Sequence, residues 1–288
     1  MTLSPSPAVK TAGLSKRYRA GWLNRREVNA LEPLTLEVRP GEVFGLLGPN
    51  GSGKTTTLKL LLGFLRPSSG TAELLGRPAG DVAVKARLGF LPEETYLHGF
   101  LDADETLDFY GSLFGLPKAE RKRRADALLS RLGLEKARSR PVREYSKGMA
   151  RRLGFAQALI NDPELLILDE PTSGLDPLGN AEIKDLILEL KARGKTLLVS
   201  SHLLADMERV CDRIAILYEG RLVETGNVKD LLTLGEVSTL KARGAPPQVM
   251  ELALDTLRKA GADAVLDHPT ETLEAHFLRV VGRQRKPG

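Results

Sequence analysis

Short apolar segments separated by polar turns predict β-strands in the first hundred residues. Strand-like patterns cover residues 8–12, 34–38 and 43–47, and the second of these alternates apolar and polar positions as a half-buried antiparallel strand does. Residues 56–65 then predict an apolar helix, and two further strands are expected at 70–76 and 88–91.

The pattern changes to helix between about residues 100 and 160. One helix is expected to open near Asp104 and another to cover 118–132. Strand and helix then alternate again, with strands at 165–168 and 196–200 around a helix at 179–193, and with 214–217 and 221–224 pairing as a hairpin. This order predicts an α/β core interrupted by a helical insert.

The last part of the chain has a different pattern. It predicts a strand at 237–243, an amphipathic helix at 247–260, a short strand at 264–266 and a final helix at 272–281. We therefore expect a large domain over residues 1–232, with its helical insert at about 95–160, and a small α/β accessory subdomain over 233–288.

Composition is that of an ordinary globular protein, with 42% hydrophobic and 27% charged residues. The longest apolar run, Leu58 to Leu65, is far shorter than the ~20 residues that cross a bilayer. The first residues lack a signal-peptide pattern, so a cytoplasmic protein is expected. The single cysteine, Cys211, excludes an internal disulfide and is expected to be a buried packing residue.

The formal net charge of +5 comes partly from basic clusters at residues 121–124 and 283–286. Such clusters could contact nucleic acid or anionic lipid headgroups, but they are usually solvated faces, and interleaved aromatic residues are missing. Nucleic acid is therefore not an expected partner.

Residues 48–56, Gly-Pro-Asn-Gly-Ser-Gly-Lys-Thr-Thr, form the most informative motif. The spacing of a phosphate-binding loop is matched by Gly48, Gly53, Lys54 and Thr55. Its place between an expected strand and an expected helix lets backbone N–H groups point at phosphate oxygens. Lys54 would reach the β- and γ-phosphates and Thr55 would ligate magnesium. The chain is therefore expected to bind a nucleoside triphosphate.

Two carboxylates follow the apolar run at 165–168. A buried strand would deliver Asp169 to the magnesium shell, and Glu170 would take a proton from an attacking water. In isolation this could be a core strand that meets a polar turn, but the phosphate loop upstream favours the chemical interpretation.

A second anion site is expected where Ser146 and Gly148 precede a long helix. Serine caps many helices, so the motif is weak alone. Its position about twenty residues before the acidic strand resembles the ATP-binding cassette (ABC) ATPases, and the resemblance covers roughly residues 8 to 232. It implies a P-loop NTPase cassette with a RecA-like core, an antiparallel β subdomain and a helical subdomain.

The resemblance also implies further site residues. Tyr18 is similar to the aromatic residue that stacks on adenine, with Trp22 as a nearby alternative. Glu93 stands where the family usually has a glutamine that senses magnesium and the membrane partner, and it can still ligate a cation. The other positions that match family motifs are Asn50, Gly51 and Thr56 in the phosphate loop, Asp176 in the loop that links protomers, and the switch histidine His202.

This resemblance implies ATP hydrolysis with Mg²⁺, in which Glu170, His202 and Lys54 are the catalytic residues. Two cassettes, either two copies of this chain or this chain and a paralogue, would face head to tail. ATP would bind between the phosphate loop of one and the opposing signature loop, which Ser146 and Gly148 match. An integral membrane permease would be a separate subunit that holds the cassette at the inner face of the membrane. The forms Tyr-Ser-Lys-Gly-Met at 145–149, Leu-Pro-Glu at 91–93 and Thr-Leu-Glu-Ala-His-Phe-Leu at 272–278 together resemble export systems. An importer ATPase and a soluble ABC ATPase acting on nucleic acid or ribosomes remain as alternatives.

Overall fold

The computed structural model describes residues 6–20, 26–233, 242 and 244–265. The chain divides into two compact units, Met1–Leu231 and Leu232–Gly288. Within the described residues no helix has the length and hydropathy needed to cross a membrane. Of the sequence predictions, Trp22, the helix at 272–281 and the basic cluster at 283–286 lie outside these ranges.

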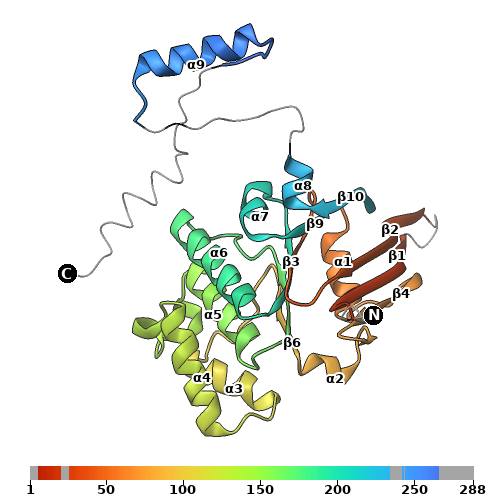
Figure 1. The fold of residues 1–288 in the computed structure, drawn as a ribbon. Helices are drawn as coiled ribbons and strands as arrows, with labels where there is room; N and C mark the ends of the chain where they lie inside the picture. Colours follow the sequence, from red (N-terminus) through yellow and green to blue (C-terminus); the bar gives the residue numbers. More distant parts are fainter. Residues whose placement is uncertain (1–5, 21–25, 234–241, 243, 266–288) are drawn as a thin grey trace. The chain divides into compact units, whose positions relative to one another are not determined.

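The first unit contains two β-sheets (Figure 1). The antiparallel sheet has the order β2-β1-β4-β5, built from β1 (Val9–Ala20), β2 (Arg26–Val38), β4 (Ser69–Leu74) and β5 (Arg77–Pro78). The larger sheet has the order β10-β9-β3-β8-β7-β6, built from β3 (Val43–Leu47), β6 (Leu88–Leu91), β7 (Leu165–Asp169), β8 (Thr196–Ser201), β9 (Arg213–Tyr218) and β10 (Arg221–Asn227). Its strands pair in parallel except for β10, which forms the predicted hairpin with β9.

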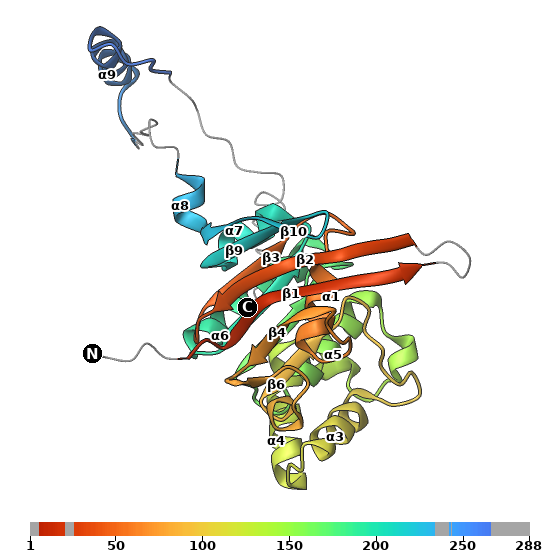
Figure 2. The same cartoon turned by 90° about the vertical axis from the view of Figure 1, so that its right-hand side faces the viewer.

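Helices cover both faces of the larger sheet (Figures 1 and 2). Helix α1 (Lys54–Leu61) lies between the two sheets, where it contacts β2, β4 and β7. The helices of the insert and of the opposite face are α3 (Ala103–Leu113), α4 (Lys118–Arg131), α5 (Lys147–Leu159), α6 (Pro177–Ala192) and α7 (Leu204–Val210). The shorter helices are α2 (Val82–Lys85), η1 (Glu135–Ala137), η2 (Val142–Glu144) and α8 (Val228–Leu232).

The larger sheet separates two apolar cores. Along β7, Leu165 and Ile167 pack towards α1 and the antiparallel sheet, whereas Leu166 and Leu168 pack towards α5 and α6. Side chains that alternate between the two faces explain why this strand has no polar position before Asp169. Cys211 is buried in one of these cores as predicted, and burial raises the pKa of its thiol to about 12.

Several element boundaries differ from the sequence predictions. Helix α1 begins at Lys54 rather than at residue 56. It ends at Leu61 rather than at residue 65, because Gly63 takes a left-handed conformation (φ +73°). In the second unit, α9 (Pro247–Lys259) matches the expected helix. The strand expected at 264–266 is wrong for Ala264 and Val265, which are in no element, and Leu266 lies outside the described residues. The strand expected at 237–243 also lies outside the described residues, except for Ala242, which is not in a strand.

The basic cluster at 121–124 lies on α4 and is locally paired. Arg121 contacts Asp108 at 2.6 Å, and Arg123 and Arg124 both contact Glu120, at 2.7 and 2.6 Å. Lys122 contacts Asp126 at 2.9 Å. The charges of this cluster are therefore largely balanced by carboxylates on α4 itself and on the neighbouring α3.

A capping box starts α3. Glu105 N–H donates to the Asp102 carboxylate (2.8 Å), and Asp102 N–H donates to the Glu105 carboxylate (3.0 Å). The cap places the helix start at Ala103, close to the expected Asp104. Asp102→Ala is expected to lower the free energy of unfolding by about 1 kcal/mol, measured by urea denaturation. Asp185→Ala is the control, since its exposed ion pair with Arg209 (3.8 Å) should contribute little. Equal effects from both would contradict the capping role.

Candidate functional site

The phosphate loop connects β3 to α1 and is packed tightly against neighbouring backbone. A Cβ atom at Gly48 (φ +152°) would lie 2.1 Å from the Leu217 carbonyl oxygen, and one at Gly53 (φ +102°) would lie 2.9 Å from the Ala30 carbonyl oxygen. Both positions therefore require glycine, for conformation and for space. Gly51 (φ +79°) also needs this freedom, although its surroundings are open.

The β9–β10 turn supports the loop from behind. Gly220 N–H donates to the Ser52 carbonyl oxygen at 3.1 Å. The Ser52 hydroxyl is buried and has no hydrogen-bond partner among the described residues. A buried polar atom without a partner inside such a loop fits a ligand that would supply one.

Lys54 is buried at the start of α1 and points back into the loop. Its ammonium donates to the carbonyl oxygens of Gly48 (2.6 Å) and Pro49 (3.2 Å). The same Nζ atom lies 3.6 Å from Oε1 of Glu170. A buried cation thus joins the phosphate loop to the end of β7.

Asp169 ends β7 and is held by two hydroxyls. Ser200 on β8 donates a hydrogen bond to its carboxylate, and Thr55 on α1 does the same. Burial raises the pKa of Asp169, while these two hydrogen bonds and the charge of Lys54 act in the opposite direction. A cation bound here would favour the charged carboxylate.

Glu170 lies between Lys54 and His202. Its Oε2 atom is 2.8 Å from Nδ1 of His202, which follows β8. The Glu170 backbone takes a left-handed conformation (φ +48°), which is uncommon for a residue other than glycine, asparagine or aspartate. Local strain of this kind often accompanies a functional site.

The structure thus brings together five of the predicted residues, namely Lys54, Thr55, Asp169, Glu170 and His202. They come from α1 and from the carboxyl ends of β7 and β8, where ligands bind in open α/β sheets. Glu93 is near through its backbone only: its carbonyl accepts a hydrogen bond from Arg151, and its side chain is exposed.

Ser146, Gly148 and Asp176 form a different group. Ser146 caps α5 by accepting a hydrogen bond from Met149 N–H (3.2 Å), and Asp176 caps α6 by accepting one from Gly179 N–H (2.7 Å). A Cβ atom at Gly148 would lie 3.5 Å from the Leu175 side chain, so the two helix starts are neighbours. Among the described residues no hydrogen bond or ion pair joins this group to Lys54 or Glu170.

The remaining predicted residues lie near the surface. Tyr18 on β1 is exposed, with the Lys16 ammonium 5.2 Å from its ring centre, and pairs with Val28 on β2. Asn50 is exposed at the tip of the phosphate loop, and Thr56 is half-buried on α1.

Sequence reasoning missed Ser200 and Arg151. Ser200 lies within an apolar strand and gave no signal. Arg151 did give one, because it shares a helix face with the buried residues Gly154, Phe155 and Ala158. A charged residue on such a face needs buried partners.

These residues fit MgATP. The described residues hold no cluster of three or more His, Cys, Asp or Glu that would form a cation site alone. Mg²⁺ is usually held by one or two protein ligands together with substrate phosphates, and Thr55 beside Asp169 is such a pair. Glycines without space for Cβ and the unpaired Ser52 hydroxyl fit a phosphate chain.

A family model described as ABC transporter matches residues 31–173. An uncharacterized ABC transporter ATP-binding protein of Synechocystis sp. is 49% identical over 244 residues, which is 84% of this chain and 69% of that protein. The chain belongs to the ABC transporter family. It is an ATP-binding, ATP-hydrolysing subunit, and the resemblance inferred from its motifs is confirmed.

Other relatives of this ABC subunit agree. The Nod factor export ATP-binding protein I of Ralstonia nicotianae is 35% identical, covering 99% of this chain and 97% of that protein. A solved ATP-binding subunit of an ABC transporter has a TM-score of 0.70 at 34% identity, covering 78% of this chain and 91% of that one. A dimeric ATP-binding cassette bound to ADP and Pi also has a TM-score of 0.70, at 25% identity, covering 76% of this chain and 98% of that one. The predicted cassette fold is confirmed.

Proposed function

We propose that this ABC ATPase hydrolyses MgATP to drive a separate membrane permease in the direction of export. The observation that carries the proposal is that buried Lys54 and Glu170 meet the more exposed His202 beside Asp169. A phosphate-binding cation, a proton acceptor and a histidine at one end of a parallel sheet fit phosphoryl transfer to water.

Each residue has a proposed role. Lys54 and the loop N–H groups bind the β- and γ-phosphates, and Glu170 accepts the proton of the attacking water. His202, 2.8 Å from Glu170, orients that carboxylate and contacts the γ-phosphate. Mg²⁺ held by Thr55 and Asp169 would neutralise charge on the phosphates. Tyr18 is proposed to stack on adenine, and Glu93 to contact the cation after its side chain turns inwards.

A second cassette would complete the site. Ser146 and Gly148 lie at the N-terminus of α5, where backbone N–H groups favour an anion. Within the described residues they share no hydrogen bond with Lys54, so they fit the role of binding the γ-phosphate held by a second copy or a paralogue. Asp176 would lie at the same interface. Solved relatives that are dimeric cassettes support this arrangement.

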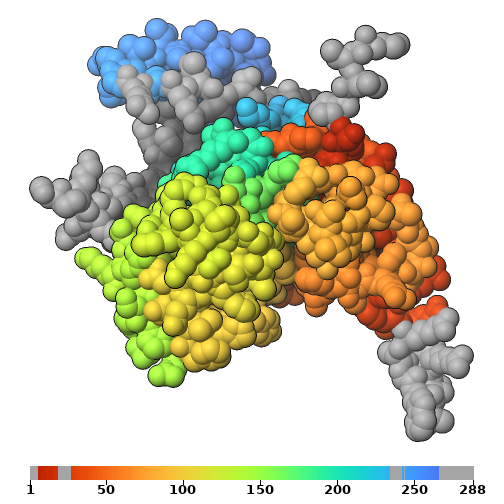
Figure 3. Space-filling model, turned by 90° about the horizontal axis from the view of Figure 1, so that it is seen from below, coloured from red at the N-terminus to blue at the C-terminus, as the bar shows by residue number. Residues whose placement is uncertain are grey.

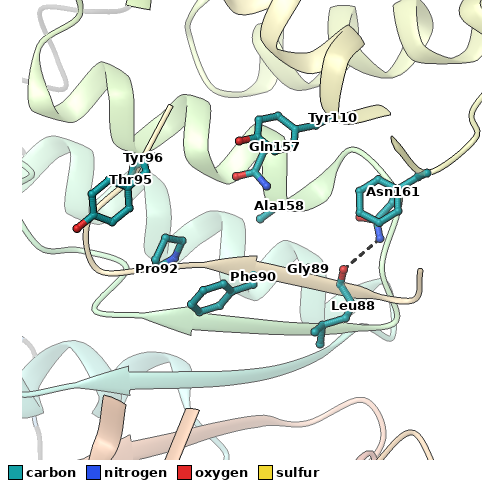
Figure 4. A pocket seen from close by; sticks show the side chains of 11 residues that line it. Leu88, Gly89, Phe90, Pro92, Thr95, Tyr96, Tyr110, Gln157, Ala158 and Asn161 are labelled. Carbon is teal, nitrogen blue, oxygen red and sulfur yellow. Dashed lines mark hydrogen bonds between the residues drawn. The ribbon is translucent and has the colours of Figure 1, made fainter. Parts of the chain in front are cut away.

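A cavity beside Glu93 is the proposed docking site for the permease. It has a volume of about 260 Å³ and lies between β6, α3 and α5, with Phe90, Pro92, Tyr110 and Gln157 in its lining (Figure 4). Nearby apolar side chains are exposed, including Tyr96 (78%) and Phe100 (72%). Helices α3 and α4 form a surface lobe here, drawn in yellow beside the orange residues around α2 (Figure 3). We propose that a short cytoplasmic segment of the permease inserts an apolar side chain into this cavity.

Export is proposed from the relatives. Several are named Nod factor export ATP-binding protein I, and two of them align with nearly the whole of this chain. The permease would then hold this protein at the inner face of the membrane.

Co-purification from gently solubilised membranes tests this function. We expect mass spectrometry to find a polytopic membrane protein in near-stoichiometric amount with the tagged wild-type chain. Phe114→Asp in the cavity lining is expected to reduce that amount at least tenfold, because a charge would have to be buried. Val223→Asp on β10, also exposed and away from the cavity, is the matched control. Recovery of ribosomal proteins without a membrane subunit would overturn the permease proposal and favour the soluble class.

A further inference from the structure

Arg151 is an unusually placed cation. It lies in the second turn of α5, after the Ser146 cap, and only 4% of the residue is exposed. Burial lowers the pKa of its guanidinium to about 10, while the charges of Asp169, Glu93 and Glu170 raise it. Arginine is almost never buried unless its donors are paired.

All the donors of Arg151 are directed at backbone carbonyl oxygens. Nε donates to Pro171 at 3.3 Å, one terminal nitrogen donates to Pro92 and to Glu93 (2.8 Å), and the other donates to Asp169 and Glu170, both at 2.6 Å. The planar fork of a guanidinium can serve five acceptors in this way, whereas a lysine ammonium has three donors on one atom.

These carbonyls belong to two segments of the site. One follows β6 and carries Glu93; the other ends β7 and carries the two carboxylates. Arg151 therefore ties α5, whose N-terminus carries Ser146 and Gly148, to both segments at once.

Two of these contacts, both at 2.6 Å and both from the same terminal nitrogen, lie on either side of Glu170. The carbonyl of Asp169 belongs to the peptide plane before Glu170, and the carbonyl of Glu170 to the plane after it. Because peptide planes are rigid, the angle between these planes is set by φ and ψ of Glu170. A single nitrogen that binds both carbonyls thus holds Glu170 at its left-handed φ of +48°.

We propose that Arg151 is a positioning residue for ATP hydrolysis. By fixing both peptide planes around Glu170, it keeps the Glu170 carboxylate between Lys54 and His202. This inference depends on the proposed role of Glu170 as the proton acceptor.

Arg151→Lys tests the inference, because it keeps the charge and removes the fork. We expect kcat for ATP hydrolysis to fall about tenfold, as when a supporting hydrogen bond of a catalytic group is lost. The dissociation constant for ATP should stay within about twofold, because the five hydrogen bonds of Arg151 go to residues outside the phosphate loop. Arg124→Lys is the matched control: its guanidinium donates to the Ile160 carbonyl (2.9 Å) at the opposite end of α5, and its kcat should be that of the wild type.

A double-mutant cycle with Glu170→Gln separates positioning from general support of the fold. If Arg151 acts through Glu170, Arg151→Lys should change single-turnover hydrolysis by less than about twofold in the Glu170→Gln background. A further tenfold loss in that background would overturn the proposal. Loss of ATP binding together with turnover would overturn it too, because Arg151 would then support the site as a whole.

The same measurements distinguish the two levels of inference. Normal turnover of Glu170→Gln would remove the proposed proton acceptor itself. Impaired Glu170→Gln with normal Arg151→Lys would leave that role intact and reject only the positioning role of Arg151.

Discussion

Glu170→Gln is expected to reduce the turnover of ATP hydrolysis by about 10²–10⁴-fold while ATP binding is retained. Glutamine has the same shape and can still contact Lys54 and His202, but it cannot accept a proton from water at neutral pH. The measurement is phosphate release at saturating MgATP, together with the ATP dissociation constant from calorimetry.

Glu164→Gln is a suitable control for this experiment. Glu164 precedes β7 and pairs with Arg87 at 2.6 Å, and both side chains are substantially exposed. Its loss should leave turnover unchanged. Turnover of Glu170→Gln near that of the wild type would reject Glu170 as the proton acceptor.

Lys54→Ala is expected to weaken ATP binding about 10- to 100-fold. Hydrogen bonds to charged groups contribute about 1.5–3 kcal/mol each, and every 1.4 kcal/mol changes an affinity tenfold. The ammonium of Lys54 contacts two loop carbonyls in this structure, so its donors are already directed at the loop into which the phosphates would bind. Calorimetry with ATP in the presence of Mg²⁺ gives the dissociation constant directly.

Lys59→Ala provides the comparison on the same helix. The Lys59 side chain is exposed on α1, so the Lys59→Ala variant should bind ATP as the wild type does. An unchanged affinity in Lys54→Ala would contradict a role in phosphate binding. Circular dichroism of both variants tests whether α1 remains folded.

The sequence was sufficient to predict the residues whose positions follow from parallel strands. Asp169 ends β7, His202 follows β8 and Lys54 begins α1, and such positions meet at one edge of the sheet. Their meeting could therefore be expected from order and spacing alone.

Other contacts could not be predicted in that way. The five acceptors of Arg151 are backbone carbonyls, which every residue carries, so no residue type marks them in the sequence. The hydrogen bond from Ser200 to Asp169 depends on the register of β7 against β8. The early end of α1 depends on Gly63. A Cβ atom at this position would lie only 2.5 Å from the Cα atom of Gly80.

Because β3 and β7 contribute side chains to both apolar cores, the two halves of the large unit share their central strands. Neither core can melt without removing the support of the other, so the unit is expected to unfold cooperatively. The loop and carboxylates that follow these strands are thus attached to the part of the chain that opens last. Helices α3 and α4 contribute buried side chains to only one of the two cores, so they are less firmly tied to this base than β3 and β7 are.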